Sequence, residues 1–422
     1  MGRTDYRPEW YRCRDGSAIA VRVREILENE LTLEGAVSVA LLNNRELQSV
    51  LEQLGIASAE LAQAGLLKNP ILSLAYRFST QPAAAGALID ISLLQNFIDT
   101  LLIPLKKKRA AAELEATKAR VTASVLDLIR EVKTSYYAYQ ARRQLWDLRE
   151  QFLLAAESSY EVARHLMAAG NIKEVDLAQR QAAYEQAKIE VADAEIQALA
   201  AQELLRRLLG LWGSQEMQIT IIGLSPCPPY EGDWQDVVGR ALECSLDLAQ
   251  AYYHLRATAA KFGVDTTNVV FPTSELGPAA EREEGIWYVG PAVTLPLPIF
   301  DTGKAMTAAA QSEIYRQWNH YTALAINIRS QARIARLQLL NAFRQSRYYR
   351  EVIVPLMEEV TQLTLRQYNA MQVGVFQLLS AKQAELESKI REVEVLLECW
   401  IAKTEMELLM SGHLRDKEMG WK

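Results

Sequence analysis

Most of the chain repeats apolar residues at intervals of three and four, which is the spacing of one face of an α-helix. Between Pro104 and Arg164 no proline or glycine interrupts this pattern. A helix of about 60 residues would be roughly 90 Å long. We predict long helices at residues 104–164, 175–209, 304–365 and 376–410. Pro355 lies inside the third helix and is expected to kink or break it.

Two other regions alternate apolar residues with small or polar ones, as strands do when successive side chains point to opposite faces. We predict strand pairs at about 70–97 and 268–296, with loops at 79–87 and 277–285. The third strand, around 268–276, has the weakest alternation. The predicted apolar face comprises Leu72, Leu74, Tyr76, Phe78, Ile91, Trp287 and Val293, and the polar face comprises Ser73, Arg77, Asp90, Tyr288 and Thr294.

Strands of about 9–11 residues with one apolar face and aromatic residues near their ends suit an outer-membrane barrel. The apolar face would contact lipid and the polar face would line the lumen. Four strands cannot close a barrel, because about eight are needed. A barrel of these strands would therefore be shared between several chains, since lipid tolerates no unpaired backbone. The alternative is a pair of surface hairpins on a soluble helical protein.

The two halves of the sequence resemble each other when the chain is shifted by about 201 residues. "AAGNIKEVDLAQRQA" from Ala168 aligns with "NAMQVGVFQLLSAKQA" from Asn369, and "FIDT" aligns with "IFDT". Each half runs helix, strand, loop, strand, long helix, turn, long helix. We divide the chain into an N-terminal extension at 1–30, a first repeat at 31–212, a linker at 213–234, a second repeat at 235–412 and a C-terminal tail at 413–422.

Composition narrows the function classes. The net charge is −6, and the only basic tract is Lys106–Arg109, which argues against nucleic acid as a partner. The four cysteines have neither metal-ligand nor disulfide-framework spacing, so we predict no metal site and no cofactor. No nucleophile–base set or phosphate-binding loop is evident, so no enzyme activity is predicted.

Two segments of the chain bear on membrane targeting. The first 25 residues contain no apolar signal-peptide core, which leaves either a cytoplasmic protein or a leader preceding Met1. Residues 84–105 are apolar enough to suggest a spanning helix, but they include Asp90 and Asp99. Each mid-helix aspartate costs about 2.5–3.5 kcal/mol on insertion, so we do not predict a transmembrane helix there.

The chain resembles TolC-type outer-membrane efflux channels, most closely the branch associated with metal and drug efflux. The resemblance runs from about Leu31 to Gly412. It rests on the order of "LTLEGAVSVALLNNRELQ", "AGLLKNPILSL", "ISLLQNFIDTLLIPLKKKRAAAE", "AAGNIKEVDLAQ", "VGPAVTLPLPIFDTGKA" and "YNAMQVGVFQLLSAKQAEL". It implies a homotrimer in the bacterial outer membrane that extends into the periplasm. The trimer would share one 12-stranded β-barrel above a long α-helical barrel, and would partner a periplasmic adaptor and an inner-membrane pump.

The same resemblance assigns roles to turn residues. Where a strand is followed by a helix, strand pairing must end and the chain must turn towards the helical barrel. The residues placed at these turns are Pro104, Pro296, Pro298, Asp301 and Gly303. Proline cannot donate to a strand ladder, Asp301 is expected to cap a helix, and Gly303 to form an unusual turn. The Lys106–Arg109 cluster would then lie at the inner rim of the membrane, near lipid head groups.

The periplasmic entrance of the family lies at the helix tips, where two acidic residues of the second repeat narrow the opening in its best-known member. The residues of this chain implied at the entrance are Gly170, Asp176, Tyr368, Met371, Gly374, Gln377 and Ser380. Gln377 and Ser380 fall at the acidic positions, so that ring of charge is absent. Met371 falls at the tip glycine. A soluble coiled-coil scaffold and a periplasmic adaptor remain the alternative functions, and the exported substrate is not evident.

Overall fold

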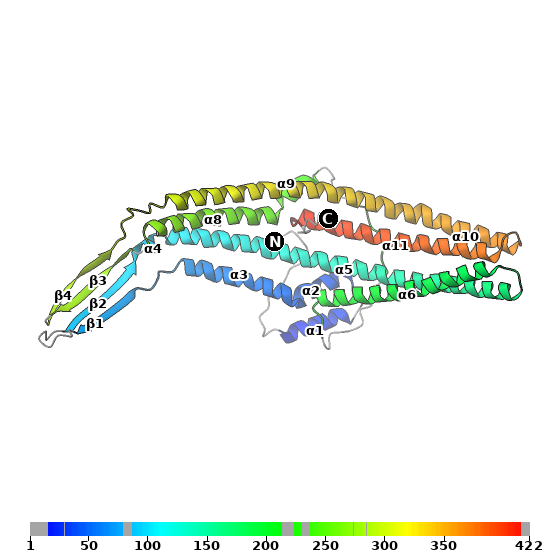
Figure 1. Cartoon of the computed structure of the whole chain (residues 1–422), viewed down its shortest axis with the longest axis horizontal. Helices are drawn as coiled ribbons and strands as arrows, with labels where there is room; N and C mark the ends of the chain where they lie inside the picture. Colours follow the sequence, from blue (N-terminus) through cyan, green and yellow to red (C-terminus); the bar gives the residue numbers. More distant parts are fainter. Residues whose placement is uncertain are drawn as a thin grey trace. The chain divides into compact units, whose positions relative to one another are not determined.

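The computed structural model describes residues 16–28, 30–78, 87–212, 223–229, 236–272, 274–283 and 285–414. The chain divides into two compact units, and Figure 1 labels its helices and strands. The first, here called the strand unit, comprises residues 50–122 and 246–326. The second, here called the tip unit, comprises residues 1–49, 123–245 and 327–422. Three helices contribute residues to both units: α3 (Arg45–Ala64), α5 (Ile103–Ala168) and α9 (Lys304–Tyr348).

The strand unit contains one antiparallel sheet in the order β1-β2-β3-β4. Its elements besides the shared helices are β1 (Ile71–Phe78), β2 (Ala87–Asn96), β3 (Glu275–Glu283), β4 (Ile286–Thr294), α4 (Phe97–Leu101) and α8 (Leu246–Val270). The helices of this unit pack closely through small residues. A Cβ on Gly263 of α8 would lie only 2.6 Å from a methyl carbon of Leu105 in α5. Gln317 of α9 donates a hydrogen bond to Thr258 Oγ1 of α8 at 2.9 Å.

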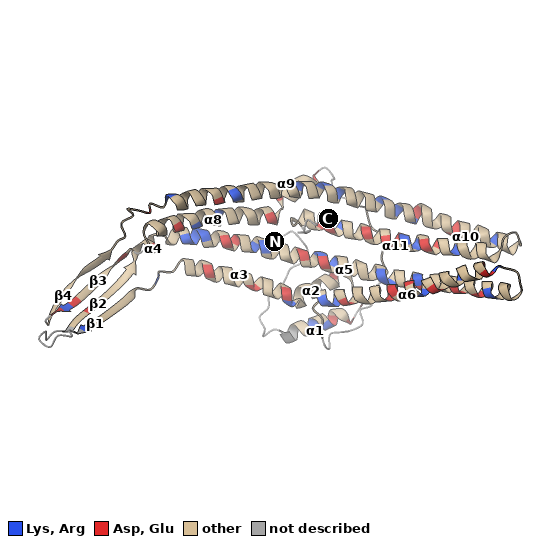
Figure 2. Ribbon diagram, in the orientation of Figure 1, with Lys and Arg blue, Asp and Glu red and all other residues tan. Residues whose placement is uncertain are grey.

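The tip unit is helical in its described residues. Its elements besides the shared helices are α1 (Gly16–Leu27), α2 (Leu33–Asn43), α6 (Glu174–Leu208), α7 (Val237–Glu243), the π-helix η3 (Tyr349–Ile353), α10 (Val354–Asn369) and α11 (Val375–Ser411). Its core includes fully buried Val132, Leu205 and Val395. Figure 2 marks acidic and basic residues along the helices, with few on β1 and β2.

The long helices lie where the apolar periodicity predicts them. The structure has helices at Ile103–Ala168, Glu174–Leu208 and Val375–Ser411. The predicted helix at 304–365 is divided into α9 and α10 by the five-residue π-helix that ends just before Pro355. Proline has no backbone N–H, so the turn before it loses one hydrogen bond and widens. Pro355 therefore interrupts the helix, as predicted.

The prediction of the third strand was wrong. Residues 268–270 end the helix α8, and β3 spans Glu275–Glu283, most of the predicted loop. The β-branched run around Thr267 suggests a strand, but Thr267 Oγ1 donates to Gly263 O at 2.9 Å and the helix continues. Proline weakens a strand ladder because it has no N–H to donate, and Pro278 would therefore be unusual in a strand. It lies within β3, opposite Pro291 of β4, where the two strands still pair.

The predicted role of Pro104 also needs correction. β2 ends at Asn96, and Asn96 Oδ1 accepts a hydrogen bond from Asp99 N at 2.9 Å, which caps α4. Pro104 lies in the first turn of α5, where its missing N–H has no helical partner to lose. Asn96 thus ends the strand, and Pro104 helps to start the long helix.

No helix in the described parts of the chain has the length and apolar composition of a membrane span. The segment considered as a spanning helix contains β2 and α4. Residues 79–86 of the predicted loop, and most of the predicted linker and C-terminal tail, lie outside the described residues, and Ala87 begins β2.

Candidate functional site

The sheet of the strand unit has two chemically different faces. In an antiparallel pair, residues directly opposite one another point to the same side. One row across all four strands runs through Leu74, Ile91, Ala280 and Val289. A second row on this face contains Tyr76, Ile89, Arg282 and Trp287. The register thus places the predicted apolar residues together, apart from Phe78, whose side chain is not among those described.

The opposite face is small and polar. Its central row runs through Ala75, Asp90, Glu281 and Tyr288. Asp90 and Glu281 lie directly opposite one another, and like charges in such a pair destabilise a sheet unless water screens them. This face therefore suits a wet environment. The remaining predicted polar residues share the face, with Ser73 opposite Ser92, Thr294 opposite Glu275, and Arg77 opposite Leu88.

The apolar face is uncovered in the single chain. Leu74 is 70% exposed and Val289 is 76% exposed, and Leu72, Tyr76 and Trp287 are also exposed. Contiguous apolar surface of this kind marks a protein or membrane interaction site. An aromatic residue lies near the hairpin turn, where Arg282 stacks over the ring of Trp287 at 5.9 Å. A face of this composition fits a hydrocarbon environment bordered by a polar interface.

An ion-pair cluster fixes the junction between β2 and the long helix. The carboxylate of Asp99 pairs with Lys106 Nζ at 2.6 Å and also with Lys68. Burial alone would raise the pKa of Asp99, but the hydrogen bonds from Lys106 and Lys68 outweigh it and hold that pKa below its usual value. Asp99 therefore stays charged and ties α4 to α5.

The four residues of the predicted basic cluster, Lys106–Arg109, have different surroundings. Lys106 is neutralised by Asp99, and Arg109 pairs with Glu113 at 2.9 Å. Lys107 and Lys108 are exposed, so they are the two cations of the tract most available to an anionic surface.

The second strand-to-helix junction is built around Gly303. Its backbone has φ +76°, and its N–H donates to Asp301 Oδ1 at 2.9 Å. A left-handed conformation of this kind favours glycine. Pro296 and Pro298 lie in the irregular stretch between β4 and α9, as predicted, and this stretch also exposes apolar side chains, Phe300 completely.

The turn between α5 and α6 ends in a left-handed glycine. Gly170 has φ +74°, and its N–H donates to Met167 O at 2.9 Å. The following N–H, of Asn171, donates to Leu166 O at 2.8 Å. This pair of bonds is the Schellman arrangement that closes many helix C-termini.

The turn between α10 and α11 has the same arrangement without a glycine. Met371 has φ +56°, and its N–H donates to Tyr368 O at 2.9 Å. The N–H of Gln372 donates to Gln367 O at 2.9 Å. Met371 is the one non-glycine residue with positive φ in the described chain, and its side chain is 95% exposed. The tip is therefore built around a strained residue whose side chain packs on nothing.

The first helical turns after the two tips differ in charge. Asp176 Oδ2 accepts a hydrogen bond from Lys173 N at 3.4 Å, at the start of α6. At the start of α11, Gln377 is exposed and neutral, and its N–H donates to Gly374 O at 3.1 Å. Ser380 is exposed one turn further along. No carboxylate stands at either exposed position.

The two tips contact each other through a cation and an aromatic ring. The guanidinium of Arg180 in α6 lies 4.9 Å from the centre of the Phe376 ring in α11. Such contacts contribute about 0.5–1 kcal/mol where they are exposed. The sequence analysis did not identify this pair, because the two residues belong to different halves of the chain.

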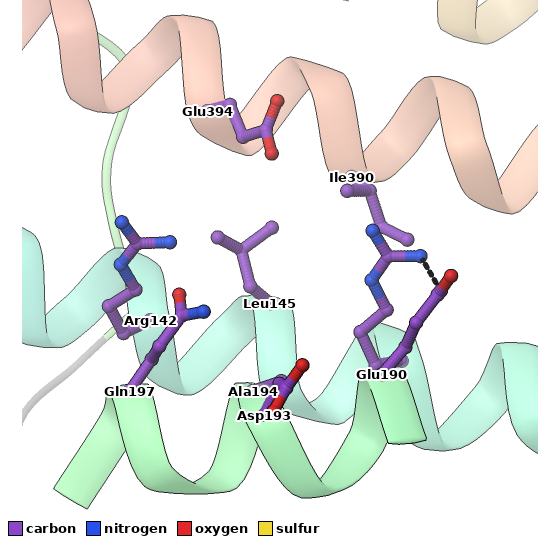
Figure 3. A pocket seen from close by; sticks show the side chains of 9 residues that line it. Arg142, Leu145, Glu190, Asp193, Ala194, Gln197, Ile390 and Glu394 are labelled. Atoms are coloured by element: carbon purple, nitrogen blue, oxygen red, sulfur yellow. Dashed lines mark hydrogen bonds and ion pairs between the residues drawn. The ribbon is translucent and has the colours of Figure 1, made fainter. Parts of the chain in front are cut away.

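A polar pocket lies further along the tip unit, between α5, α6 and α11 (Figure 3). It is lined by Arg142, Leu145, Arg149, Glu190, Asp193, Ala194, Gln197, Ile390 and Glu394. Arg149 pairs with Glu190 at 2.6 Å. Charges of both signs line the walls, so the pocket does not select an anion or a cation. In the described part of the chain, no three His, Cys, Asp or Glu side chains group as a metal site would require.

Two asparagines that sequence reasoning missed secure the end of α6. Asn43 Nδ2 donates to Leu209 O at 3.1 Å and to Gly210 O at 2.7 Å, and Asn44 Nδ2 donates to Leu208 O at 3.0 Å. Gly210 has φ +68°, and a Cβ there would lie 2.6 Å from Asn43 O. The motif "LLNNREL" marked the position, but only the long-range contact shows what the amides do.

The chain combines a two-faced antiparallel sheet with helices of 66 and 45 residues. Residues 36–211 match the family described as "Outer membrane efflux protein". This match confirms the predicted resemblance.

Individual proteins similar to this chain support the same resemblance. The chain is 23% identical over 393 residues to the cobalt-zinc-cadmium resistance protein CzcC of Cupriavidus metallidurans, which covers 90% of each chain. Its fold is similar to that of CusC, with TM-score 0.72, 16% identity, and 91% and 92% of the two chains covered. It is also similar to the MtrE outer-membrane channel of Neisseria gonorrhoeae, with TM-score 0.70, 15% identity, and 91% and 89% covered. The predicted outer-membrane location is confirmed, and relatives named for efflux fit the prediction of a non-enzyme.

Proposed function

We propose that three copies of this chain form one outer-membrane channel that is the exit duct of a tripartite efflux pump. The observation that carries this proposal is the sheet order, which leaves β1 and β4 as edges of a four-stranded sheet with one apolar and one polar face. Unpaired strand edges are not tolerated in lipid. Pairing β4 of one copy with β1 of the next removes every edge and gives a closed barrel of 12 strands.

In this assembly the two sheet faces have different solvents. Leu72, Leu74, Ile91 and Val293 contact lipid tails, and Asp90 with its neighbours lines a wet lumen. The opposed carboxylates of Asp90 and Glu281 support this orientation, because water screens their repulsion. The exposed Lys107 and Lys108 meet lipid head groups at the inner rim.

The helical part forms the tunnel through the periplasm, and the two helix tips form its entrance. The chain repeats itself, so Gly170 and Met371 are equivalent positions at the two tips, each with positive φ and the same pair of backbone hydrogen bonds. Opening moves the second tip outward, with Tyr368 and Gly374 at the moving turn. The entrance carries Gln377 and Ser380 where a ring of carboxylates stands in the family's best-known member.

The channel works with a periplasmic adaptor and an inner-membrane pump that selects the cargo. Metal ions are the favoured cargo class, because the relative that matches over nearly the whole chain is named for cobalt, zinc and cadmium resistance. Drugs and similar small organic molecules are the second class, because relatives from Pseudomonas putida that match 49% of this chain are named as antibiotic and toluene efflux pump proteins. A deletion strain is grown in the presence of cadmium or of toluene, with and without the restored gene. The compound against which the gene restores growth identifies the cargo class.

The experiment that tests the channel proposal is a matched pair of substitutions on adjacent residues of β1. Leu74→Arg places a charge on the apolar face at a cost of about 2–4 kcal/mol per chain near the bilayer midplane. Ser73→Arg places the same charge on the polar face. We expect Leu74→Arg to abolish recovery from the outer-membrane fraction and Ser73→Arg to leave it nearly unchanged.

Equal loss from both substitutions would refute the assigned faces. Full recovery of both from the soluble fraction would favour the alternative of a soluble coiled-coil scaffold or a periplasmic adaptor. The two-faced sheet opposes that alternative, since neither role needs exposed apolar strands.

A further inference from the structure

Two buried cysteines from distant parts of the chain meet in the tip unit. Cys227 lies in the segment 223–229, and Cys399 lies in α11. Both thiols are free in the structure, and each lies near enough to shift the pKa of the other. Cys399 is fully buried and Cys227 is 9% exposed. The spacing of cysteines in the sequence predicted no disulfide framework, and spacing cannot show a contact of this range.

The segment that carries Cys227 is held against α11 by bonds that do not involve sulfur. Trp400 Nε1, next to Cys399, donates to Ser225 O at 2.8 Å. The ring of Trp400 stacks on Tyr137 with centroids 4.3 Å apart, and Leu224 is buried. Cys227 and Cys399 are therefore brought together by their neighbours, whatever the state of their thiols.

We propose that Cys227 and Cys399 form an intrachain disulfide in the mature protein. The proposal rests on the proposed function in one respect, because an exported channel has its tip unit in the oxidising periplasm, where paired thiols become disulfides. In this protein the bond would fasten the segment 223–229 to α11. Cys244 lies elsewhere, at the C-cap of α7, and is only partly buried.

The oxidant is a disulfide donor of the thiol–disulfide exchange class. One of the two thiolates attacks one donor sulfur, the donor S–S bond breaks, and a mixed disulfide forms. The second cysteine then attacks the sulfur of the first and releases the donor as a dithiol, which carries away two electrons and the two thiol protons. Because Cys399 is fully buried in the folded chain, this exchange precedes the packing of segment 223–229 onto α11.

The experiment compares the native protein with itself before and after reduction. Protein recovered from the outer-membrane fraction is denatured in N-ethylmaleimide, digested and analysed by mass spectrometry. We expect one linked pair of peptides containing Cys227 and Cys399, about 2 Da lighter than the two thiol peptides together because two hydrogens have left. Cys244→Ser serves as the control and should leave the linked pair unchanged. Reductant should lower Tm by roughly 5 °C in the native chain and not in Cys227→Ser.

Recovery of both peptides alkylated, without prior reduction, would overturn the disulfide while leaving the channel proposal intact. Absence of the chain from the outer-membrane fraction would instead contradict the proposed function. In that case the unfolded chain is refolded in detergent with oxidised glutathione. Formation of the same linked pair there supports the geometry, and its absence overturns it.

Discussion

Replacing Met371 with glycine should stabilise the turn between α10 and α11. Met371 holds φ +56°, a left-handed conformation that costs a non-glycine residue about 1–2 kcal/mol. Its side chain is 95% exposed, so removing the side chain sacrifices almost no packing. Glycine also gains freedom in the unfolded turn, which offsets part of the relief by about 0.5–1 kcal/mol. The net gain expected for Met371→Gly is about 0.5–1 kcal/mol.

Hydrogen exchange measures this change at the two amides that close the turn. The N–H groups of Met371 and Gln372 bond to Tyr368 O and Gln367 O, both at 2.9 Å, and exchange when the turn opens. A gain of about 0.5–1 kcal/mol slows their exchange by roughly two- to fivefold. Amides in the middle of α11 should exchange at unchanged rates.

The turn between α5 and α6 supplies the matched control. Gly170 has φ +74°, and no atom lies within 4 Å of a Cβ built on it. Gly170→Met therefore adds backbone strain without a clash and should speed exchange of the amides of Gly170 and Asn171 by a similar factor. Faster exchange in Met371→Gly, or no change in either variant, would refute the view that backbone strain sets the stability of the tips.

Three further predictions concern the entrance, the core and pH. Gln377→Asp combined with Ser380→Asp puts six carboxylates around the entrance of a trimer, so a hexaammine cation added on the periplasmic side should block conductance strongly in this variant and weakly in the native channel. Asn43→Leu leaves Leu209 O and Gly210 O without its amide and should lower the free energy of unfolding by about 1–3 kcal/mol in a denaturant titration. Burial, with Arg120 nearby, lowers the pKa of His254 below its usual 6.5. The neutral form of His254 therefore contributes stability above pH 6.5, and this contribution is lost as the pH falls below 6.5. His254→Gln should flatten this pH dependence in thermal melts at about pH 5–8.

Most of the secondary structure could be predicted because it follows local patterns. The helix α5 has an unbroken apolar periodicity, and β1 alternates strictly, so each is specified by its own residues. β3 could not be predicted, because its alternation is interrupted by Pro278 and its charged end resembles a loop. Pairing with β2 and β4 on both sides decides its conformation; β4 follows β3 closely, but β2 lies in the other half of the chain.

The candidate site also has features that the sequence predicts and features that only the structure shows. The repeat located Met371 as the tip position, but only the structure shows that its backbone is left-handed. The faces of β1, β2 and β4 follow from alternation, whereas the opposition of Asp90 and Glu281 depends on register between the two halves of the chain. The sequence did not predict the hydrogen bonds from the side-chain amide of Asn43 or the thiol pair of Cys227 and Cys399. Both depend on contacts between residues that lie far apart in the sequence.

The mass of the folded assembly tests the central claim most directly. One chain has a mass of 47.4 kDa and supplies a sheet with two open edges. Native mass spectrometry of protein solubilised from the outer membrane should therefore give three times the chain mass, because only a shared barrel closes those edges. A stable, folded species at the mass of a single chain would contradict the shared channel.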